Sequence, residues 1–431
     1  MLRILINKLF YSFTVLLGVV SLVFFIFNLS PADPARQIAG QNDSEEVLAA
    51  IRKNLGLDLP IGTRYLLYLN DLSPISIHNK IDHESPSFLS DEKYSYFKLF
   101  NFSESALVLK FPYLRRSYKS NRPVAEIIVS SLPGTVILAV SAMSFALIFG
   151  IALGIFTALR KGKPEDHLSL FISALGMSLP SFFMAILVAW LGGLVWFEQI
   201  YFPLMPFVFM ILVLILYWFK SKNLSPAIEK KWTKYAIIGF TLGLLYCLLP
   251  LLLPVSIHKF MPWADNLIYL PGTGLPMTGS LYDIDPWIGV YLKPENLILP
   301  ALTLGIRPLS VIVQLTRNSL LEVLDSDFVR TAKAKGLSPF RVIVIHALRN
   351  ALNPVVTAVS GWFASLLAGA VFVEFVFGWK GLGLEVFSAL EKEDLPVVMG
   401  AVLIIACTFV LINLLVDIIY TWLDPRVRLN A

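Results

Sequence analysis

The sequence is poor in charge and in cysteine for its length. Of 431 residues, 15% are Asp, Glu, Lys or Arg, and two, Cys247 and Cys407, are cysteine. Both cysteines lie in apolar stretches, so they predict neither a disulfide framework nor a metal site. The low charge excludes a large soluble enzyme, because soluble domains average about a quarter charged residues.

The sequence also lacks the motifs of nucleotide and metal chemistry. Gly162-Lys163 resembles the end of a phosphate-binding loop, but Thr157 replaces the upstream glycine and Pro164 replaces the magnesium-binding Ser or Thr. No His-Glu-x-x-His, Gly-x-Ser-x-Gly or Cys-x-x-Cys motif occurs, and the five histidines are scattered. We therefore predict no catalytic residues, no metal and no cofactor. Any ATPase that drives this protein belongs to a partner subunit.

Long apolar stretches dominate the chain. Hydrophobic residues make up 56% of it and the mean hydropathy is +0.71, which predicts an all-α, polytopic membrane protein. Eight stretches are long enough to cross about 30 Å of hydrocarbon, near residues 9–29, 132–159, 169–197, 201–219, 235–254, 296–316, 354–377 and 396–421. The first exceeds the apolar core of a signal peptide and precedes a poor cleavage site, so we expect it to be retained.

Basic residues cluster in short loops that fall on one side of the membrane. They precede the first span, fill the connections near residues 160–163, 220–234 and 317–349, and follow the last span, whereas the 378–395 connection is rich in acidic residues. The positive-inside rule therefore predicts that both termini are cytoplasmic. The same rule explains the net charge of +5 and the isoelectric point near 9.0, so no nucleic-acid partner is implied.

This topology divides the chain into regions. Residues 1–30 hold the first transmembrane helix, residues 31–131 an extracytoplasmic region, and residues 132–425 the transmembrane domain, with a cytoplasmic loop at about 317–353. Residues of about 200–262 predict an inserted two-helix hairpin. Because it crosses the membrane an even number of times, it leaves the later loop at about 317–353 on the cytoplasmic side. Residues 71–108 are polar and aromatic without a clean period, so a contact surface for a soluble partner and a tolerated surface loop are both open.

The segment from Asp327 to Pro354 is charged and helix-forming, and it lies between two apolar spans. Gly336 supplies the left-handed conformation that ends a helix, and Ser338 followed by Pro339 is an N-cap with proline at the first helical position. The spacing predicts two short helices joined by a sharp turn. Apolar residues at three- and four-residue spacing predict one packing face on the second helix: Phe340, Ile343, Val344, Ala347, Leu348 and Ala351. Taken alone, this pattern also fits an ordinary amphipathic connector.

The same segment resembles the cytoplasmic signature loop of importer-type ABC-transporter permeases. Ala332, Gly336 and Leu348 agree with the general pattern of that loop, and the stretches 330–338 and 346–352 resemble the branch for dipeptides, oligopeptides and nickel. The resemblance covers most of the chain outside residues of about 70–108 and 200–262. Further landmarks follow in family order: Asp33-Pro34-Ala35, Leu55-Gly56-Leu57-Asp58, Ser178-Leu179-Pro180-Ser181, Leu299-Pro300-Ala301-Leu302, Phe372-Val373-Glu374, Gly381-Leu382-Gly383 and Leu423-Asp424-Pro425-Arg426.

The resemblance implies a fold, a set of partners and a site. The fold is the type I importer permease, with six core transmembrane helices, here with the inserted hairpin, in the cell inner membrane. The implied partners are two ATP-binding subunits, a second and often non-identical permease, an extracytoplasmic substrate-binding protein and the lipid bilayer. The implied residues of the ATPase-coupling loop are Arg330, Thr331, Ala332, Lys333, Gly336, Leu337, His346 and Leu348.

Few charged residues lie inside the apolar spans. Arg307 and Glu374 are the candidates for the translocation path, although Glu374 lies close enough to an interface to favour a structural pair. Gly150 and Gly154 predict a helix-packing face. The substrate stays open among peptides, nickel chelates and glycosides. A secondary carrier, an exporter or a structural membrane scaffold is the alternative to an importer subunit.

Overall fold

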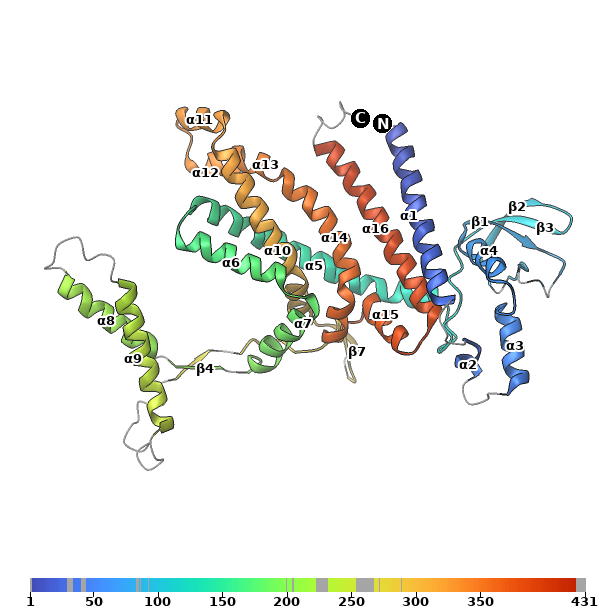
Figure 1. Cartoon of the computed structure of the whole chain (residues 1–431), viewed down its shortest axis with the longest axis horizontal. Helices are drawn as coiled ribbons and strands as arrows, with labels where there is room; N and C mark the ends of the chain where they lie inside the picture. The colour runs from blue at the N-terminus through green and yellow to red at the C-terminus, as the bar shows by residue number, and fades with distance from the viewer. Residues whose placement is uncertain are drawn as a thin grey trace. The chain divides into compact units, whose positions relative to one another are not determined.

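The computed structural model describes residues 2–423, apart from residues 29–33, 40–43, 83–84, 86, 92, 199, 204, 222–231, 253–266, 271 and 288. The chain forms two compact units. The first joins Met1–Ala189 to Thr278–Ala431, and the second is Trp190–Met277. Figure 1 shows that the first unit is built mainly of long helices.

Membrane-spanning helices in the described part of the chain fall into two kinds. Four are single helices: Phe10–Asn28, Val124–Leu159, Glu295–Leu324 and Leu395–Leu415. Two are bent pairs, Pro164–Ser178 with Ser181–Val195 at 110° and Pro339–Ala351 with Asn353–Leu367 at 50°. If each bent pair counts as one span, the described chain has up to six spans, the number that the resemblance implies for the core. Pro339–Ala351, the first part of the second pair, lies outside the span predicted at 354–377. The prediction of a single helix over 169–197 is wrong, because the chain breaks at Leu179-Pro180, where proline cannot continue a helix.

Two long helices, α5 (Val124–Leu159) and α10 (Glu295–Leu324), pack closely against each other in the first unit. An added Cβ on Gly150 would lie 2.8 Å from Ile312 Cγ2, and one on Gly154 would lie 2.5 Å from Thr316 Cβ. These glycines therefore form the predicted packing face, since only hydrogen fits in the space. The helix α6 (Pro164–Ser178) packs on α10 as well, where Gly176 faces Ser310.

Both long helices extend beyond their predicted bounds. The helix α5 begins at Val124 rather than near residue 132, because Val124 and Ile128 are buried against Leu382 and Val397. The helix α10 runs to Leu324, so the predicted loop at 317–353 is helical over its first residues. Burial of Leu320 in a core cluster shared with α5 supports this extension. Tertiary packing therefore sets the start of α5 and the end of α10, and the local sequence pattern does not contain that information.

The C-terminal third of the chain forms α14 (Asn353–Phe377), α15 (Leu382–Glu391) and α16 (Leu395–Leu423). Gly378, at φ +62°, ends α14 in the left-handed conformation. A hairpin of β6 (Tyr282–Asp285) and β7 (Gly289–Leu292) precedes α10. The first helix, α1 (Leu2–Asn28), packs on α16.

The N-terminal region (residues 34–123) follows α1 and contains α2 (Pro34–Ala39), α3 (Glu45–Leu55) and α4 (Ile61–Leu72). It also contains an antiparallel sheet in the order β1 (Ile75–Asn79), β3 (Ser105–Lys110), β2 (Tyr96–Asn101). The fold is mostly helical, as predicted, and this sheet is a small addition to it in residues 71–108, where the sequence showed no clean period. Apolar and polar residues alternate in β1, but Ser76 and His78 are buried while Ile75 and Ile77 are exposed. The alternation therefore indicates the wrong buried face.

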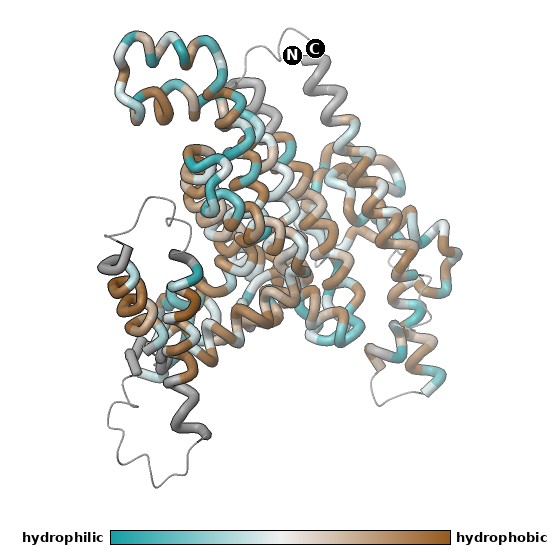
Figure 2. The backbone as a smooth tube through the Cα atoms, turned by 60° about the vertical axis from the view of Figure 1, so that its left-hand side comes forward, coloured by the Kyte–Doolittle hydropathy of each residue, from teal (hydrophilic) through white to brown (hydrophobic). Residues whose placement is uncertain are grey.

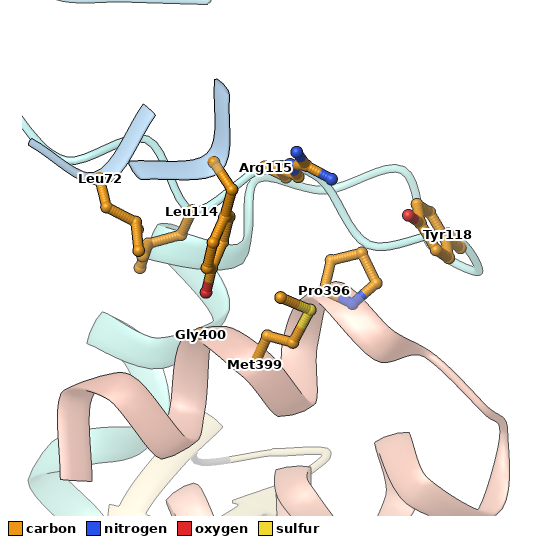
Figure 3. Close-up of a pocket in the computed structure, with 8 residues that line it drawn as sticks. Leu72, Leu114, Arg115, Tyr118, Pro396, Met399 and Gly400 are labelled. Atoms are coloured by element: carbon orange, nitrogen blue, oxygen red, sulfur yellow. The ribbon is translucent and has the colours of Figure 1, made fainter. Parts of the chain in front are cut away.

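The N-terminal region is attached to the start of α16. Asp394 is buried and accepts hydrogen bonds from the Ser117 hydroxyl and, at 3.0 Å, from the Tyr118 backbone N–H. Figure 3 shows Arg115 and Tyr118 beside Pro396 and Met399 of α16, around a small pocket of about 20 Å³. Residues far apart in the sequence therefore form one surface here.

The second unit contains α8 (Met205–Ser221), α9 (Trp232–Leu252) and a two-stranded sheet of β4 (Ile200–Pro203) and β5 (Leu267–Leu270). Phe207 lies 5.5 Å from Phe240, and Tyr217 lies 4.2 Å from Tyr235, measured between ring centroids. The two helices are therefore antiparallel. Their apolar described parts, Pro206–Tyr217 and Lys234–Leu245, are shorter than the spans predicted at 201–219 and 235–254.

Candidate functional site

The elbow (residues 327–351) connects α10 to α14. It consists of α11 (Asp327–Ala334), a turn, α12 (Pro339–Arg341), the π-helical turn η4 (Val342–Ala347) and α13 (Leu348–Ala351). Gly336 has φ +71°, and Ser338 is extended before Pro339, which begins α12. The predicted sharp turn is confirmed. Ser338 occupies the N-cap position, but its hydroxyl makes no capping hydrogen bond.

One side of the elbow is anchored to the helical unit. Val329 and Ala332 of α11 are buried in a cluster with Leu320 of α10 and Ala158 of α5. Leu337 in the turn is partly buried against the same cluster. Because interior packing is dense, a displacement of α11 would press on the ends of α5 and α10. The elbow is thus mechanically connected to two core helices.

The second half of the elbow packs differently from the prediction. Val342, Ala347 and Ala351 are buried, whereas Phe340 is 74% exposed and Val344 is 38% exposed. The prediction of Phe340 and Val344 on the packing face is wrong, because it assumed a regular α-helix. In a π-helical turn, residues five apart lie on the same face, so Val342 and Ala347 are buried together and Val344 faces away from them.

The opposite side of the elbow is open, basic and partly apolar. Between residues 327 and 351 there are five Arg or Lys residues and one Asp, with histidine counted as neutral. Arg330, Lys333 and Lys335 are all exposed. Phe340 in α12 and Ile345 in η4, which is 54% exposed, add apolar area to the exposed part of the elbow. An apolar patch rimmed by charge is the usual composition of a protein-docking surface.

The structure gathers most of the predicted loop residues in the elbow's first half. Arg330, Thr331, Lys333 and Gly336 are exposed there, and Ala332 is buried beneath them. The other three predicted residues are placed separately: Leu337 is half-buried in the turn, His346 is exposed on the π-helical turn, and Leu348 is half-buried in α13. Figure 1 shows that α11 and α12 project at the end of the unit where α1 starts and α16 ends. Figure 2 shows hydrophilic residues concentrated in that projection and hydrophobic ones along the long helices.

The two predicted path residues have different surroundings. Glu374 of α14 is fully buried, and its carboxylate accepts hydrogen bonds from the Thr135 hydroxyl at 2.6 Å and the Leu384 backbone N–H at 3.0 Å. It therefore ties α14 to α5 and to the first turn of α15. Arg307 of α10 has its guanidinium carbon 5.9 Å from the Trp362 ring centroid. Its buried Nε has no hydrogen-bond partner among the described residues.

An ion pair that sequence reasoning missed lies near the elbow. Asp166 is 1% exposed in its side chain, and its carboxylate binds Arg317 through two contacts, 2.6 Å to Nε and 2.8 Å to Nη2. The Gly162 backbone N–H donates to the same carboxylate at 2.9 Å. The pair joins the start of α6 to α10, the helix that precedes α11 in the chain. Opposite charges at two helix ends were the only sequence signal for it.

Comparison with known proteins identifies the family of the chain. Residues 233–429 match the family described as binding-protein-dependent transport system inner membrane component, and residues 1–88 match the corresponding N-terminal family. The chain is 31% identical to the dipeptide transport system permease protein DppB of Escherichia coli K12 over 433 residues, covering 99% of each chain. The chain belongs to this permease family.

Other relatives extend the comparison. The dipeptide permease DppB of Alkalihalophilus pseudofirmus is 30% identical over 98% of each chain. The glutathione transport system permease protein GsiC of Salmonella typhimurium is 28% identical over 99% of each chain. The protein is accordingly a multi-pass transport component of the inner membrane. Its family works with an external binding protein and an ATPase.

Proposed function

We propose that this permease is one of two transmembrane subunits of an ATP-driven peptide importer, and that its elbow docks on an ATP-binding partner. The second permease is a different chain, and two ATP-binding subunits complete the membrane complex. Both termini and the elbow face the cytoplasm. The names of the relatives, which carry dipeptides or glutathione, support a peptide as the substrate.

The observation that carries this proposal is the two-sided construction of the elbow. Val329 and Ala332 are buried against the ends of α5 and α10, while Phe340 and the basic residues face outward without cover from the described chain. A connector that only joined two spans would not need an exposed phenylalanine beside five basic residues. A partner bound to the outer side can transmit its movement through the buried side.

A secondary carrier is less well supported. Such a carrier needs ionisable groups that exchange a proton or an ion near the middle of the membrane. Glu374 does not suit this role, because both of its carboxylate oxygens already accept hydrogen bonds from the protein. We place Arg307, beside Trp362, in the translocation path, because its Nε lacks a partner within the described chain.

A photo-crosslinking experiment tests the docking directly. Benzoylphenylalanine replaces Ala334, which is exposed at the end of α11, in the full importer complex. The expected result is a covalent product with the ATP-binding subunit. Benzoylphenylalanine in place of Lys119, which is exposed in the N-terminal region, is the matched control and should give no such product. Crosslinking from position 119 and none from position 334 would overturn the proposed docking and the proposed sidedness together.

A further inference from the structure

The N-terminal region and the end of α1 line an open cavity that the coupling mechanism does not use. Its volume is about 550 Å³, which falls within the range of small-ligand sites, about 300–1,000 Å³. The walls come from the last turn of α1, from α2, α3 and α4, and from the segments around residues 93–94 and 113–121. A concave site with walls from several elements suits a small molecule, because it can contact the ligand on several sides.

The cavity has an excess of positive charge. Its described lining contains four basic side chains and one carboxylate: Arg64, Lys93, Arg115, Arg116 and Asp71. Tyr113 and Tyr118 add phenol hydroxyls to the wall, and Asn28, Ser117 and Asn121 also line it. Guanidinium groups and phenol hydroxyls are donors that suit an anionic ligand.

The one carboxylate in this lining is already engaged. Asp71 accepts a hydrogen bond from the Tyr94 hydroxyl at 2.7 Å, and Arg115 Nε lies 3.8 Å from its other oxygen. Asp71 is therefore not free to balance Arg64 and Arg116, whose hydrogen-bond acceptors among the described residues are neutral oxygens. Arg64 donates to the Asn28 side chain, and Arg116 donates to the Asn121 carbonyl at 3.0 Å.

The electrostatics of Arg64 agree with this imbalance. Burial lowers the pKa of the Arg64 guanidinium below its usual value, and the nearby positive charge of Arg115 lowers it further. The two positive charges repel each other, and an anion between them would offset that repulsion.

We propose that this cavity binds the carboxylate of a small peptide, with Arg64 and Arg116 as its principal ligands. The choice of a peptide carboxylate over another anion rests on the proposed function, and the proposed topology places the cavity on the outer side of the membrane. A peptide released there would be retained beside the mouth of the complex. Arg116, which is exposed, marks the entrance, and Arg64, which is half-buried, marks the interior.

Calorimetric titration of the full, nucleotide-free importer complex in zwitterionic nanodiscs, without the external binding protein, tests this site. The probes are dialanine and dialanine amide, which differ in the terminal carboxylate. We expect dialanine to bind wild type, dialanine amide to bind at least tenfold more weakly, and Arg64→Gln and Arg116→Gln each to weaken dialanine binding at least tenfold. Lys119→Gln, on the same segment but outside the cavity, should bind like wild type.

Three results would overturn the inference: no dialanine binding, equal binding of the amide, or unchanged binding by both arginine variants. The probe comparison on wild type keeps the test valid if a variant fails to fold. The titration uses no ATP, so its failure is distinguishable from failure of the proposed function. Loss of docking of the external binding protein in Arg116→Gln, with no dialanine binding to wild type, would reassign the cavity to that protein. ATP-driven uptake that persists without dialanine binding would remove the site and leave the proposed function intact.

Discussion

Glu374 is a charged side chain in a membrane helix whose surroundings are those of a structural group. Thr135 must donate its hydroxyl proton to Glu374, because the same hydroxyl accepts the Leu382 N–H at 2.7 Å. Gly381 passes so close that an added Cβ would lie 2.5 Å from the Glu374 carboxyl carbon. The sequence identified Glu374 as notable, but its partners come from two other segments, α5 and the start of α15, and could not be read from spacing.

We expect Glu374→Gln to destabilise the protein by about 1–3 kcal/mol, because the amide NH₂ would face a hydrogen-bond donor in a buried site. Thermal unfolding of the purified protein in detergent measures this. Glu391→Gln, at an exposed position, is the control and should unfold like wild type. A Glu374→Gln variant of wild-type stability that loses transport would instead assign Glu374 to the path.

Phe340 is the most exposed large apolar side chain of the elbow. If it fills a pocket on the ATP-binding subunit, Phe340→Ala should weaken assembly by at least about 1–2 kcal/mol, the range of an aromatic anchor at an interface. Co-purification of the ATP-binding subunit at graded concentrations measures the loss. The unfolding temperature of the isolated permease should not change, because Phe340 is not in its core. Unchanged assembly would remove Phe340 from the docking surface.

At the scale of elements, the ion pair between Asp166 and Arg317 fixes α6 on α10. Removing one partner leaves a largely buried charge uncompensated, so Asp166→Asn should cost about 3–5 kcal/mol. The double variant Asp166→Asn with Arg317→Gln should recover part of that loss. Protease resistance and unfolding temperature are measured for Asp166→Asn, Arg317→Gln and the double variant, which together form a double-mutant cycle. Additive losses would show that the two side chains do not interact.

The sheet of the N-terminal region should respond to pH through His78. Burial lowers the pKa of this imidazole below its usual 6.5, with Lys110 lowering it further and the Ser87 carbonyl and Asp71 opposing the shift. The unfolded sheet therefore takes up a proton more readily than the folded one. Stability from neutral His78 is complete above about pH 6.5 and is lost as pH falls below it.

Hydrogen exchange of the β1 and β3 amides, corrected for intrinsic rates, checks this expectation at pH 7.5 and pH 5.5. Protection should fall at the lower pH in wild type. In His78→Gln, which keeps hydrogen-bonding groups toward Ser76 and Ser87, protection should be nearly the same at both values. Equal protection of wild type at both values would show that His78 does not titrate with the sheet.

The elements also show where sequence patterns are sufficient. Gly336 and Pro339 act through the backbone of their own turn, so the elbow's bend was predictable from local chemistry. The π-helical turn and the inverted β1 strand were not, because each depends on which side chains the rest of the fold buries. For that reason the packing face predicted for the second half of the elbow was wrong at Phe340 and Val344. The helix and turn predicted for the first half agree with the structure.

At the scale of the whole molecule, composition and the long apolar stretches predicted a helical membrane protein, and the family resemblance implied six core spans. The described chain has up to six candidate spans. The apolar pattern did not reveal the break between Ser178 and Ser181 in the third of them. The side of the membrane on which each loop lies is the remaining property of the whole chain.

A cysteine replacing Lys119 should react with a membrane-impermeant thiol reagent in intact cells, and one replacing Ala334 should react only after permeabilisation.

We propose that the elbow transmits force between an ATP-binding partner and the transmembrane helices. Gly336 is the sharpest place to test it. An added Cβ there meets nothing within 4 Å, so a substitution acts only through the left-handed backbone at φ +71°. Gly162, in the turn between α5 and α6, has φ +76° and the same open surroundings. It therefore offers a control with equal backbone strain at a different place.

The most direct measurement is ATP-driven uptake of dialanine by the full importer in proteoliposomes, with the external binding protein present. Gly336→Val should strain the turn by about 1–2 kcal/mol and reduce uptake at least tenfold at normal assembly. Gly336→Asn, which tolerates the left-handed conformation, and Gly162→Val should both retain most uptake. If Gly336→Val imports dialanine at the wild-type rate with the same ATPase stimulation, the elbow is an ordinary connector and the account is contradicted.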